Sequence, residues 1–394
     1  MIKKVSEAQR YLIAQLLYQF GLLFSRIFLV IFLWKGNQSL DQLAWFFLIQ
    51  SFTILLVYYP CGVFARWTSP LFAFRLGVGL YGVSYGTLLI FQHDVALLYL
   101  WIGLLTGIAE SFWSVGTHVL TMEIVPNEQR DSFSHYHYVF TSLAGMIAPF
   151  LAGSMITYLG GMKGYLAVFL ITMIFLLSSV LYSFSLRNKG YRPKSNFRAA
   201  FFNKSKAWKQ LLQASFLWIG AESLLKPFLL VMALYLIVKS EWWVGTFTTI
   251  SSLCGILASF YYAQVIQPQN RQRYYLIAAL CLFLFMIFLW SVPAFWSIVL
   301  VMVVVGITTP ALDIPMNTVM YEVIDSVTES EEQRLDFITV REIPLGLGRI
   351  AVLISFLFFH KIWTGEDFLY LMLIVFSGFY LMVYGWIRKL VDMS

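Results

Sequence analysis

Long apolar stretches, each close to the length of a membrane-spanning helix, follow one another along almost the whole chain. A bilayer core takes roughly 20 apolar residues per helix, and charged or Pro/Gly-rich breaks separate twelve stretches of this kind. They lie near residues 11–34, 42–66, 71–91, 95–122, 134–159, 164–186, 208–238, 242–266, 273–291, 294–322, 336–360 and 367–388. The pattern predicts an all-α integral membrane protein with twelve transmembrane helices.

The composition supports a membrane protein, because hydrophobic residues make up 60% of the 394 residues and charged residues only 12%. Soluble domains carry roughly 25% charged residues. The three cysteines stand singly, without the spacing of a disulfide framework or a zinc site. The sequence also lacks a G-x-x-x-x-G-K-S/T loop that would bind nucleotide phosphates. We therefore expect no enzyme activity, no cofactor and no metal site.

Basic residues are concentrated in alternate loops between the predicted helices. If the N-terminus is cytoplasmic, the inner loops and tails hold 19 Lys and Arg residues, whereas the outer loops hold only Lys35, Lys163, Lys239 and Lys361. Because cytoplasmic loops carry an excess of Lys and Arg, we expect both termini to be cytoplasmic. The N-terminal segment MIKKVSEAQR leads into an apolar run without a small-residue cleavage site. This predicts an anchored first helix in a multi-pass protein of the cell membrane.

A strongly basic segment near the middle of the chain divides it into two halves. The segment LRNKGYRPKSNFRAAFFNKSKAWKQ carries eight Lys or Arg residues and no acidic residue. Nucleic acid or acidic lipid could bind such a patch, but a cytoplasmic loop needs positive charge for topology alone. We expect contact with membrane lipids and no nucleic-acid partner. The predicted units are an N-terminal six-helix bundle at 1–186, a basic cytoplasmic linker at 187–207 and a C-terminal six-helix bundle at 208–394.

The two halves of the chain repeat each other. GIAESFWSVGTHVLTMEIV, which begins at Gly107, aligns without a gap with GITTPALDIPMNTVMYEVI, which begins at Gly306, an offset of 199 residues. RIFLV on the first predicted helix likewise aligns with KPFLL on the seventh. The aligned pairs include Arg26 with Lys226, Glu123 with Glu322, and Phe133 with Phe337. Parallel repeats of this kind are found in one class of transporter fold.

Three short motifs near this repeat resemble those of the major facilitator superfamily. VPNEQR, which ends at Arg130, looks like the family's Pro-x-x-x-Arg turn after helix four, and SEEQR, which ends at Arg334, looks like its partner after helix ten. On predicted helix five, AGMIAPFLAG contains Pro149 and ends at Gly153, and it is similar to a motif of the family's drug:proton antiporters. The resemblance covers the whole chain. It implies two pseudo-symmetric six-helix bundles and secondary active transport by a monomer.

One stretch departs from the family pattern. GVFARWTSPLF, expected as the loop between helices two and three, keeps Gly62 and Arg66 but lacks the usual Asp and second Gly. These residues belong to the inner gate in the family. The departure favours an alternative reading, in which the chain is a membrane sensor or assembly partner that keeps the fold and has lost transport.

Charged residues inside the predicted helices are the candidates for the functional site. Such groups cost a few kcal/mol each to insert, so they usually face the interior of a bundle and carry a function. The four basic residues are Arg26, Lys226, Arg341 and Arg349, and the four acidic residues are Glu110, Glu222, Asp313 and Glu342. Because the counts are equal, mutual pairing is also a sufficient explanation.

The four acids are the candidates for proton coupling, and Glu110 is the leading one. It forms a polar stripe with Ser114 and His118 on a helix that lines the cavity in the family. A fixed ion pair between Glu110 and Arg26 is the structural alternative. Glu222 and Lys226 are spaced i, i+4, as in a local ion pair. Asp313 lies between two prolines, where it is expected to satisfy backbone groups of a broken helix.

The basic residues inside the predicted helices and one serine are predicted to bind the substrate. On helix eleven, Arg341 and Glu342 fall roughly on the same face as Arg349. The substrate-binding candidates are Arg26, Lys226, Ser114, Arg341 and Arg349. The leading function is proton-coupled export of a hydrophobic or amphipathic small molecule, as the helix-five motif implies. The rival is a carrier of organic anions or organophosphates, or a lipid flippase, because Arg26 and Lys226 hold matching positions that are similar to the paired basic residues of the family's organophosphate antiporters.

Overall fold

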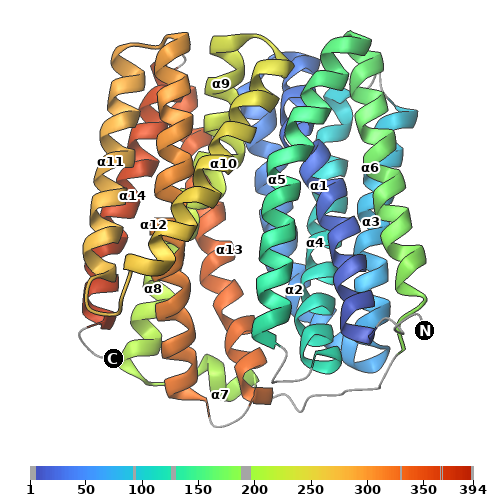
Figure 1. Ribbon diagram of the computed structural model, residues 1–394, viewed down its shortest axis with the longest axis vertical. Coiled ribbons are helices and arrows are strands. Elements are labelled where there is room, and N and C mark those ends of the chain that lie inside the picture. The colour runs from blue at the N-terminus through green and yellow to red at the C-terminus, as the bar shows by residue number, and fades with distance from the viewer. Residues whose placement is uncertain are drawn as a thin grey trace. The chain divides into compact units, whose positions relative to one another are not determined.

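Two compact units make up the protein, residues 1–193 and residues 194–394. The computed structural model describes residues 6–91, 95–125, 130–187, 197–328, 331–363, 365 and 367–391, and every regular element in them is a helix. Figure 1 shows the chain coloured from its N-terminus to its C-terminus. The division falls inside the predicted linker at 187–207, of which residues 188–196 lie outside the described residues.

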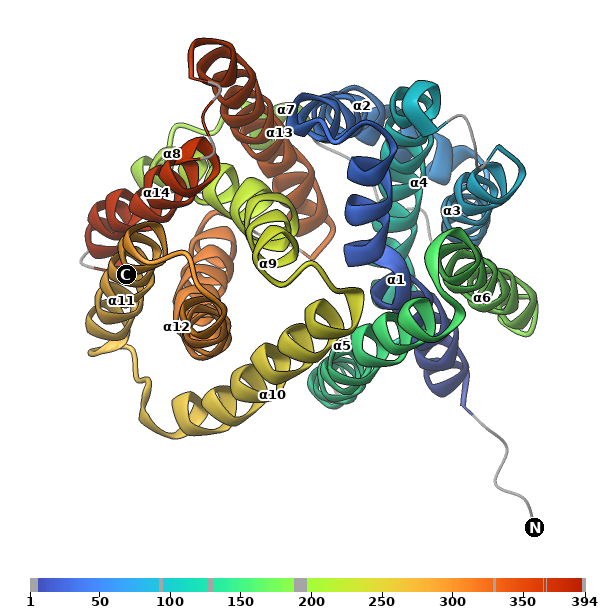
Figure 2. The same cartoon turned by 90° about the horizontal axis from the view of Figure 1, so that it is seen from above.

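The described residues of the first unit form six long helices. They are α1 (Glu7–Asn37), α2 (Leu40–Trp67), α3 (Pro70–Ile90), α4 (Val95–Ile124), α5 (Arg130–Leu159) and α6 (Gly161–Ser183). Within this unit α4 packs against α2 and α3, and α1 packs against α5 and α6 (Figure 2). Helices α1 and α4 also contact each other, so residues on their facing sides can share a site.

The second unit has the same number of spans but an interruption in the first of them. Its elements are α7 (Phe197–Phe201), α8 (Lys206–Leu224), the π-helix η2 (Leu225–Leu230), α9 (Val231–Val238), α10 (Glu241–Val265), α11 (Arg271–Ser291), α12 (Phe295–Val327), α13 (Glu331–Ile362) and α14 (Asp367–Val391). Helix α12 packs against α10 and α11, and α8 packs against α13 and α14.

Twelve helical stretches among the described residues are long and apolar enough to cross a membrane, with α8, η2 and α9 counted as one. This confirms the predicted fold class. The large exposed side chains are mostly apolar, such as Leu181 and Trp296, as expected where lipid rather than water surrounds the helices.

The turn after the first span of each unit is built in the same way. Gln38 and Lys239 end their helices in the left-handed conformation, with φ of 52° and 49°, and their N–H groups donate to carbonyl oxygens four residues earlier. In each unit the next residue, Ser39 or Ser240, is the N-cap of the following helix. Serine suits this position because its hydroxyl can accept from the first free N–H groups of a helix.

The repeat is also visible in how closely neighbouring helices approach. A Cβ placed on Gly107 of α4 would lie 2.8 Å from the carbonyl oxygen of Gln50 on α2, and one placed on the aligned Gly306 of α12 would collide with the carbonyl oxygen of Ser251 on α10. Only glycine allows backbones to meet at this distance. The aligned glycines therefore hold equivalent helix pairs together in the two units.

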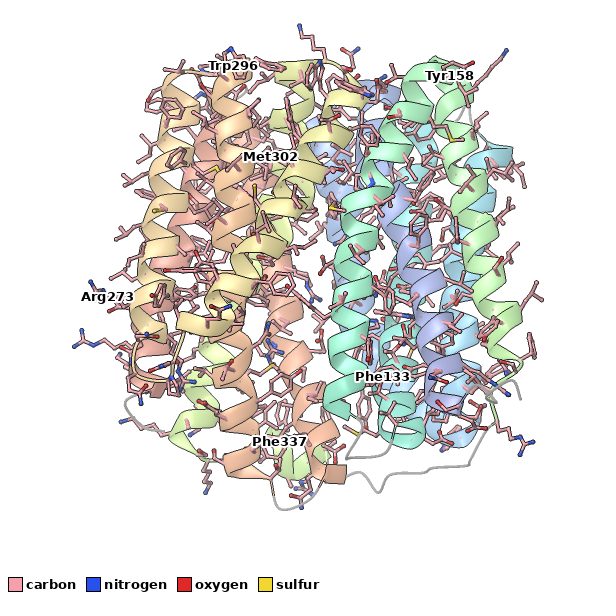
Figure 3. The ribbon with its side chains drawn as sticks, viewed as in Figure 1. Phe133, Tyr158, Arg273, Trp296, Met302 and Phe337 are labelled. Carbon is pink, nitrogen blue, oxygen red and sulfur yellow. The ribbon has the colours of Figure 1, made fainter. Side chains whose placement is uncertain are left out.

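The aligned phenylalanines near one end of each unit also have equivalent roles (Figure 3). Phe133 on α5 stacks on Tyr11 of α1, with ring centroids 5.6 Å apart. Phe337 on α13 meets Trp208 of α8 edge to face, with centroids 4.8 Å apart. In both units an aromatic pair therefore joins the first and fifth spans.

The expected loop between the second and third helices is almost absent. Helix α2 continues to Trp67 and α3 begins at Pro70, so Gly62 and Arg66 lie within α2. Most of this stretch is therefore helical, as the predicted spans 42–66 and 71–91 already imply, and the turn is short because Ser69 caps α3 directly and Pro70 occupies its first position, where a missing N–H has no cost. A Cβ on Gly62 would meet nothing within 4 Å, so packing does not require glycine there.

Candidate functional site

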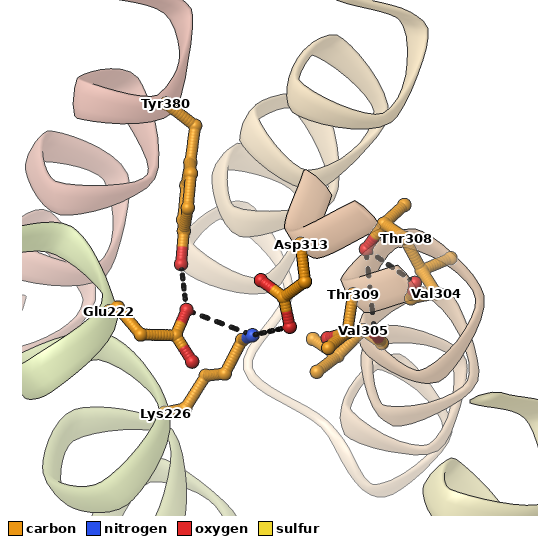
Figure 4. Close-up of polar contacts among 8 residues, drawn as sticks. All are labelled: Glu222, Lys226, Val304, Val305, Thr308, Thr309, Asp313 and Tyr380. Carbon is orange, nitrogen blue, oxygen red and sulfur yellow. Dashed lines mark hydrogen bonds and ion pairs between the residues drawn. The ribbon is translucent and has the colours of Figure 1, made fainter. Parts of the chain in front are cut away.

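Three of the predicted charged residues meet in the second unit. Lys226 Nζ lies 2.9 Å from Glu222 Oε2 and 3.9 Å from Asp313 Oδ2 (Figure 4). The hydroxyl of Tyr380 on α14 donates to the same Glu222 oxygen at 2.5 Å. We refer to Glu222, Lys226, Asp313 and Tyr380 as the Lys226 cluster. Its members come from α8, η2, α12 and α14, so three spans of one unit form it.

A local change of helix type positions the lysine. Lys226 is followed by Pro227, which has no N–H to donate to the preceding turn. The chain runs as a π-helix from Leu225 to Leu230 and then resumes as α9. Single π-turns inside α-helices are frequent at functional sites because they accommodate one extra residue per turn.

The cluster is partly buried and retains unused hydrogen-bonding capacity. The side chains of Lys226, Glu222 and Asp313 are 19%, 24% and 32% exposed. Within the described part of the chain, neither Asp313 Oδ1 nor the hydroxyl of Tyr275 on α11 has a hydrogen-bond partner, although both atoms are buried. Tyr275 interacts electrostatically with both carboxylates of the cluster. Unpartnered buried polar atoms are uncommon, and these two can each take part in a further hydrogen bond.

The charges of the cluster do not balance. Two carboxylates face one ammonium group, so the fully ionised cluster carries one net negative charge. A net charge is costly in a medium of low dielectric constant, whereas a neutral set of paired groups is less so. Adding one proton to a carboxylate makes the cluster neutral. The arrangement can therefore bind and release a single proton.

Free backbone groups of α12 do not explain why an acidic side chain stands at position 313. The helix runs without interruption from Phe295 to Val327 through both prolines, so the expected broken helix is not formed. The hydroxyls of Thr308 and Thr309, on the preceding turn, donate to the carbonyl oxygens of Val304 and Val305 at 2.7 Å (Figure 4). The carboxylate of Asp313 instead turns toward Lys226.

Glu110, the leading proton candidate from the sequence, lies in the first unit and has a different environment. Its Oε2 accepts a hydrogen bond of 2.5 Å from the hydroxyl of Tyr81 on α3. The alternative ion pair with Arg26 is not formed in the described residues, and Arg26 is exposed. Ser114, one turn further along α4, lies 3.5 Å from the hydroxyl of Tyr58 on α2. Two of the three members of the predicted polar stripe thus contact different neighbouring helices.

The charged residues of α13 separate into two groups. Glu342 and Arg349 form an ion pair at 3.7 Å. Arg341 is buried and its Nε donates to Ser215 on α8 at 3.1 Å. The guanidinium group of Arg349 thus pairs within its own helix, whereas that of Arg341 reaches a neighbouring one. Arg341 connects α13 to α8.

The motif residues have mainly structural surroundings. Arg334, at the start of α13, pairs with Asp325 near the end of α12. Arg271 on α11 forms a bidentate ion pair with Glu322 on α12, at 2.7 Å. Pro149 and Gly153 are both buried within α5. The side chains of two further motif residues, Arg66 and Arg130, lie outside the described residues.

Sequence reasoning missed the tyrosines and the tryptophan that surround the acids. Tyr380 and Tyr81 each donate to a candidate carboxylate, and Tyr18 stacks on Trp113, with ring centroids 4.5 Å apart. In the sequence they stand among many aromatic residues, which are usual at membrane interfaces and on lipid-facing surfaces. Tyr81 lies on α3 and Glu110 on α4, so no pattern within one helix could have identified their hydrogen bond.

Comparison with known proteins shows one family. The family model described as Major Facilitator Superfamily matches residues 11–330. The uncharacterized protein YqgE of Bacillus subtilis (strain 168) is 26% identical over 343 residues, which cover 86% of this chain and 80% of that protein. An auto-inhibited POT family peptide transporter has a similar structure, with a TM-score of 0.76, 10% identity and coverage of 98% of this chain and 97% of that one. The nucleoside transporter NupG gives a TM-score of 0.72 at 12% identity, with coverage of 98% and 100%. At these identities the two structures show a shared fold alone.

Proposed function

The chain belongs to the Major Facilitator Superfamily, and from this premise we propose that it is a proton-coupled secondary transporter of a small amphipathic molecule. It is a multi-pass membrane transporter and not an enzyme. The coupling proton binds at the Lys226 cluster. The direction of transport stays a prediction, and the helix-five motif implies export. The cytoplasmic orientation of both termini, the location in the cell membrane and the monomeric state are also predictions.

The charge imbalance of the Lys226 cluster is the observation that supports proton coupling. With both carboxylates ionised, Lys226 is shared between Glu222 and Asp313, at 2.9 Å and 3.9 Å. When Asp313 takes up a proton, Lys226 pairs with Glu222 alone and the link from η2 to α12 weakens. A proton therefore changes the attraction between two spans, which is what a coupled conformational change requires.

The geometry supports this cluster over Glu110 as the proton site. Glu110 has one tyrosine donor and no cationic partner among the described residues. Protonation there would not change an ion pair between helices. At Asp313 it removes one side of a contact between η2 and α12.

The alternative function, an anion carrier, rests on Arg26 and Lys226 as binding residues, and the surroundings of Lys226 weigh against it. It needs Lys226 to face an anionic substrate, as Arg26 would in the first unit. Lys226 already has two carboxylates within ion-pair distance. An anion bound there would compete with both carboxylates, so the site disfavours it.

Flux through reconstituted protein tests the proposal. Proteoliposomes that contain a pH-sensitive dye are given nucleosides, amino acids, organic anions and amphipathic cations in turn, with and without an imposed pH gradient. We expect at least one compound to move protons together with itself, and the gradient to accelerate its transport. A transported compound with no effect of the gradient would show a passive carrier. Absence of transport for the whole panel would favour a sensor.

A further inference from the structure

We infer that the first unit contains a binding site for a zwitterionic substrate, whose cationic end meets Glu110 and whose anionic end meets Arg26, beside Tyr18 and Trp113. This inference rests on the proposed transport function and names the chemical class of its substrate. The site draws on α1, α3 and α4 of the first unit, whereas the Lys226 cluster is formed by spans of the second unit.

Neither charge of this site has an ionic partner in the part of the chain that the structure describes. Glu110 Oε2 accepts from Tyr81, but no described cation pairs with this carboxylate. Arg26 makes neither an ion pair nor a hydrogen bond with any described residue. Both residues lie well inside membrane-spanning helices. An unpaired charge at this depth is costly, so it is retained where a ligand supplies the missing partner.

The repeat explains why Arg26 has no ionic partner among the described residues, whereas Lys226 has two. Arg26 and Lys226 are aligned, and the residues that align with Glu222 and Asp313 are Leu22 and Ser114. The first unit thus lacks both carboxylates of the cluster. Its own acid, Glu110, aligns with Thr309, one helical turn from the position of Asp313. The second unit pairs its charges internally, and the first keeps two opposite charges apart.

The two charges act on the same pair of tyrosines. Tyr18 and Tyr81 each interact electrostatically with both Glu110 and Arg26. Their ring centroids are 5.9 Å apart. The acid and the base therefore flank one small region, although they do not touch. A molecule that carries both charges can reach both residues from this region.

Two buried polar atoms in the same region are also without a hydrogen-bond partner among the described side chains and backbone groups. Tyr18 is 1% exposed, and its hydroxyl lies near that of Tyr81 without forming a hydrogen bond of good geometry. The indole Nε1 of Trp113, whose ring stacks on Tyr18, is buried and unpartnered as well. Buried donors of this kind usually have a partner. A bound polar ligand would supply one for each.

The surrounding helices hold these groups in place before any ligand binds. A Cβ on Gly77 of α3 would lie 2.7 Å from the Cα of Trp113, so the backbones of α3 and α4 are in close contact at this point. On the other side, Ser25 donates to the hydroxyl of Tyr85 at 2.7 Å and fixes the turn of α1 that carries Arg26. A pre-formed site loses less conformational entropy on binding.

The charges decide between ligand classes. A simple cation would gain from Glu110 but would be repelled by Arg26, and a simple anion would have the opposite problem. A zwitterion gains from both residues. It also carries no net charge into the membrane, which limits the cost of its desolvation.

Binding to the purified full-length protein in detergent tests this inference with two matched sets of probes. The first set is L-phenylalanine, phenethylamine and phenylpropanoate, and the second is aminocaproate, hexylamine and hexanoate. Each set presents a zwitterion, a cation and an anion on the same or closely matched carbon skeletons, and the two zwitterions differ in charge separation. We expect at least one zwitterion to bind at least about tenfold more tightly than its cationic and anionic analogues, as isothermal titration calorimetry would show.

Three variants locate the bound probe. Glu110→Gln and Arg26→Gln should each weaken zwitterion binding at least about tenfold. Tyr18→Phe removes only a hydroxyl without a partner, so the protein should fold normally and bind several-fold more weakly. Asp367→Asn and Lys163→Gln, which remove exposed charges at helix ends, serve as controls and should bind as the unchanged protein does.

The inference is overturned if neither zwitterion binds, if the amine or the acid alone binds as tightly, or if the three variants bind normally. Its failure is distinguishable from failure of the proposed function. A zwitterion that binds at this site but is never transported would support the site and contradict the transport function. Proton-coupled transport of another compound, without zwitterion binding, would support the transport function and contradict the zwitterion site.

Discussion

Asp313→Asn is expected to abolish transport driven by a pH gradient while leaving exchange of substrate across the membrane at equal pH. Asparagine has nearly the shape of protonated aspartic acid, so the variant imitates the neutral cluster permanently. Lys226 would then pair with Glu222 alone, at 2.9 Å. Gradient-driven uptake and equilibrium exchange, measured in the same proteoliposomes, separate the two activities. We expect the first to fall to the level of empty liposomes and the second to stay within a few-fold of normal.

The matched control for this variant is Asp367→Asn, which removes an exposed acid in the first turn of α14. It should transport as the unchanged protein does. If Asp313→Asn kept full gradient-driven transport, the coupling proton would not bind at Asp313. If both activities were lost and the protein had unfolded, Asp313 would have a structural role alone.

Lys226→Gln is expected to lower the free energy of unfolding on the order of 3 kcal/mol, because it leaves two carboxylates close together without a cation. The partial exposure of the cluster reduces the effect below that of a fully dry pair. Equilibrium unfolding in mixed micelles measures the loss. Lys389→Gln, at the exposed end of α14, is the control and should change stability by a few tenths of a kcal/mol.

A triple variant shows whether the loss is electrostatic. Lys226→Gln combined with Glu222→Gln and Asp313→Asn removes every charge of the cluster and should recover most of the stability. The triple variant should still fail to couple transport to protons. Equal instability of the single and triple variants would show instead that packing of the lysine side chain, rather than its charge, holds η2 against α12.

The sequence was sufficient for the fold because the bilayer imposes a simple rule on length and polarity. Each apolar stretch of about 20 residues had to become a helix long enough to span the bilayer, and the described residues form twelve helices of this length and composition. The repeat added that Gly107 and Gly306 hold equivalent positions, which their close helix contacts support. The bounds predicted for the second and third spans, 42–66 and 71–91, agree with α2 and α3 to within two residues, and Ser69 and Pro70 explain why the turn between these helices is so short.

The site was only partly predictable. The local pair Glu222 and Lys226 followed from helical spacing alone. The approach of Asp313 depends on how α12 packs beside α8 and η2, which no spacing within one helix contains. The π-turn had a signal in Pro227, but proline predicts an interruption without specifying its geometry. Tyr380 and Tyr81 come from other helices, so only the folded structure brings them to the acids.

Infrared difference spectroscopy of the reconstituted protein tests the central claim most directly, because protonated carboxyl groups absorb separately from carboxylates. We expect a protonated-carboxyl band that disappears as pH is raised, is present in Glu110→Gln and is absent when Glu222→Gln and Asp313→Asn are combined. This result would place the exchangeable proton at the Lys226 cluster. A band that persisted in the combined variant and vanished in Glu110→Gln would contradict the account and place the proton on Glu110.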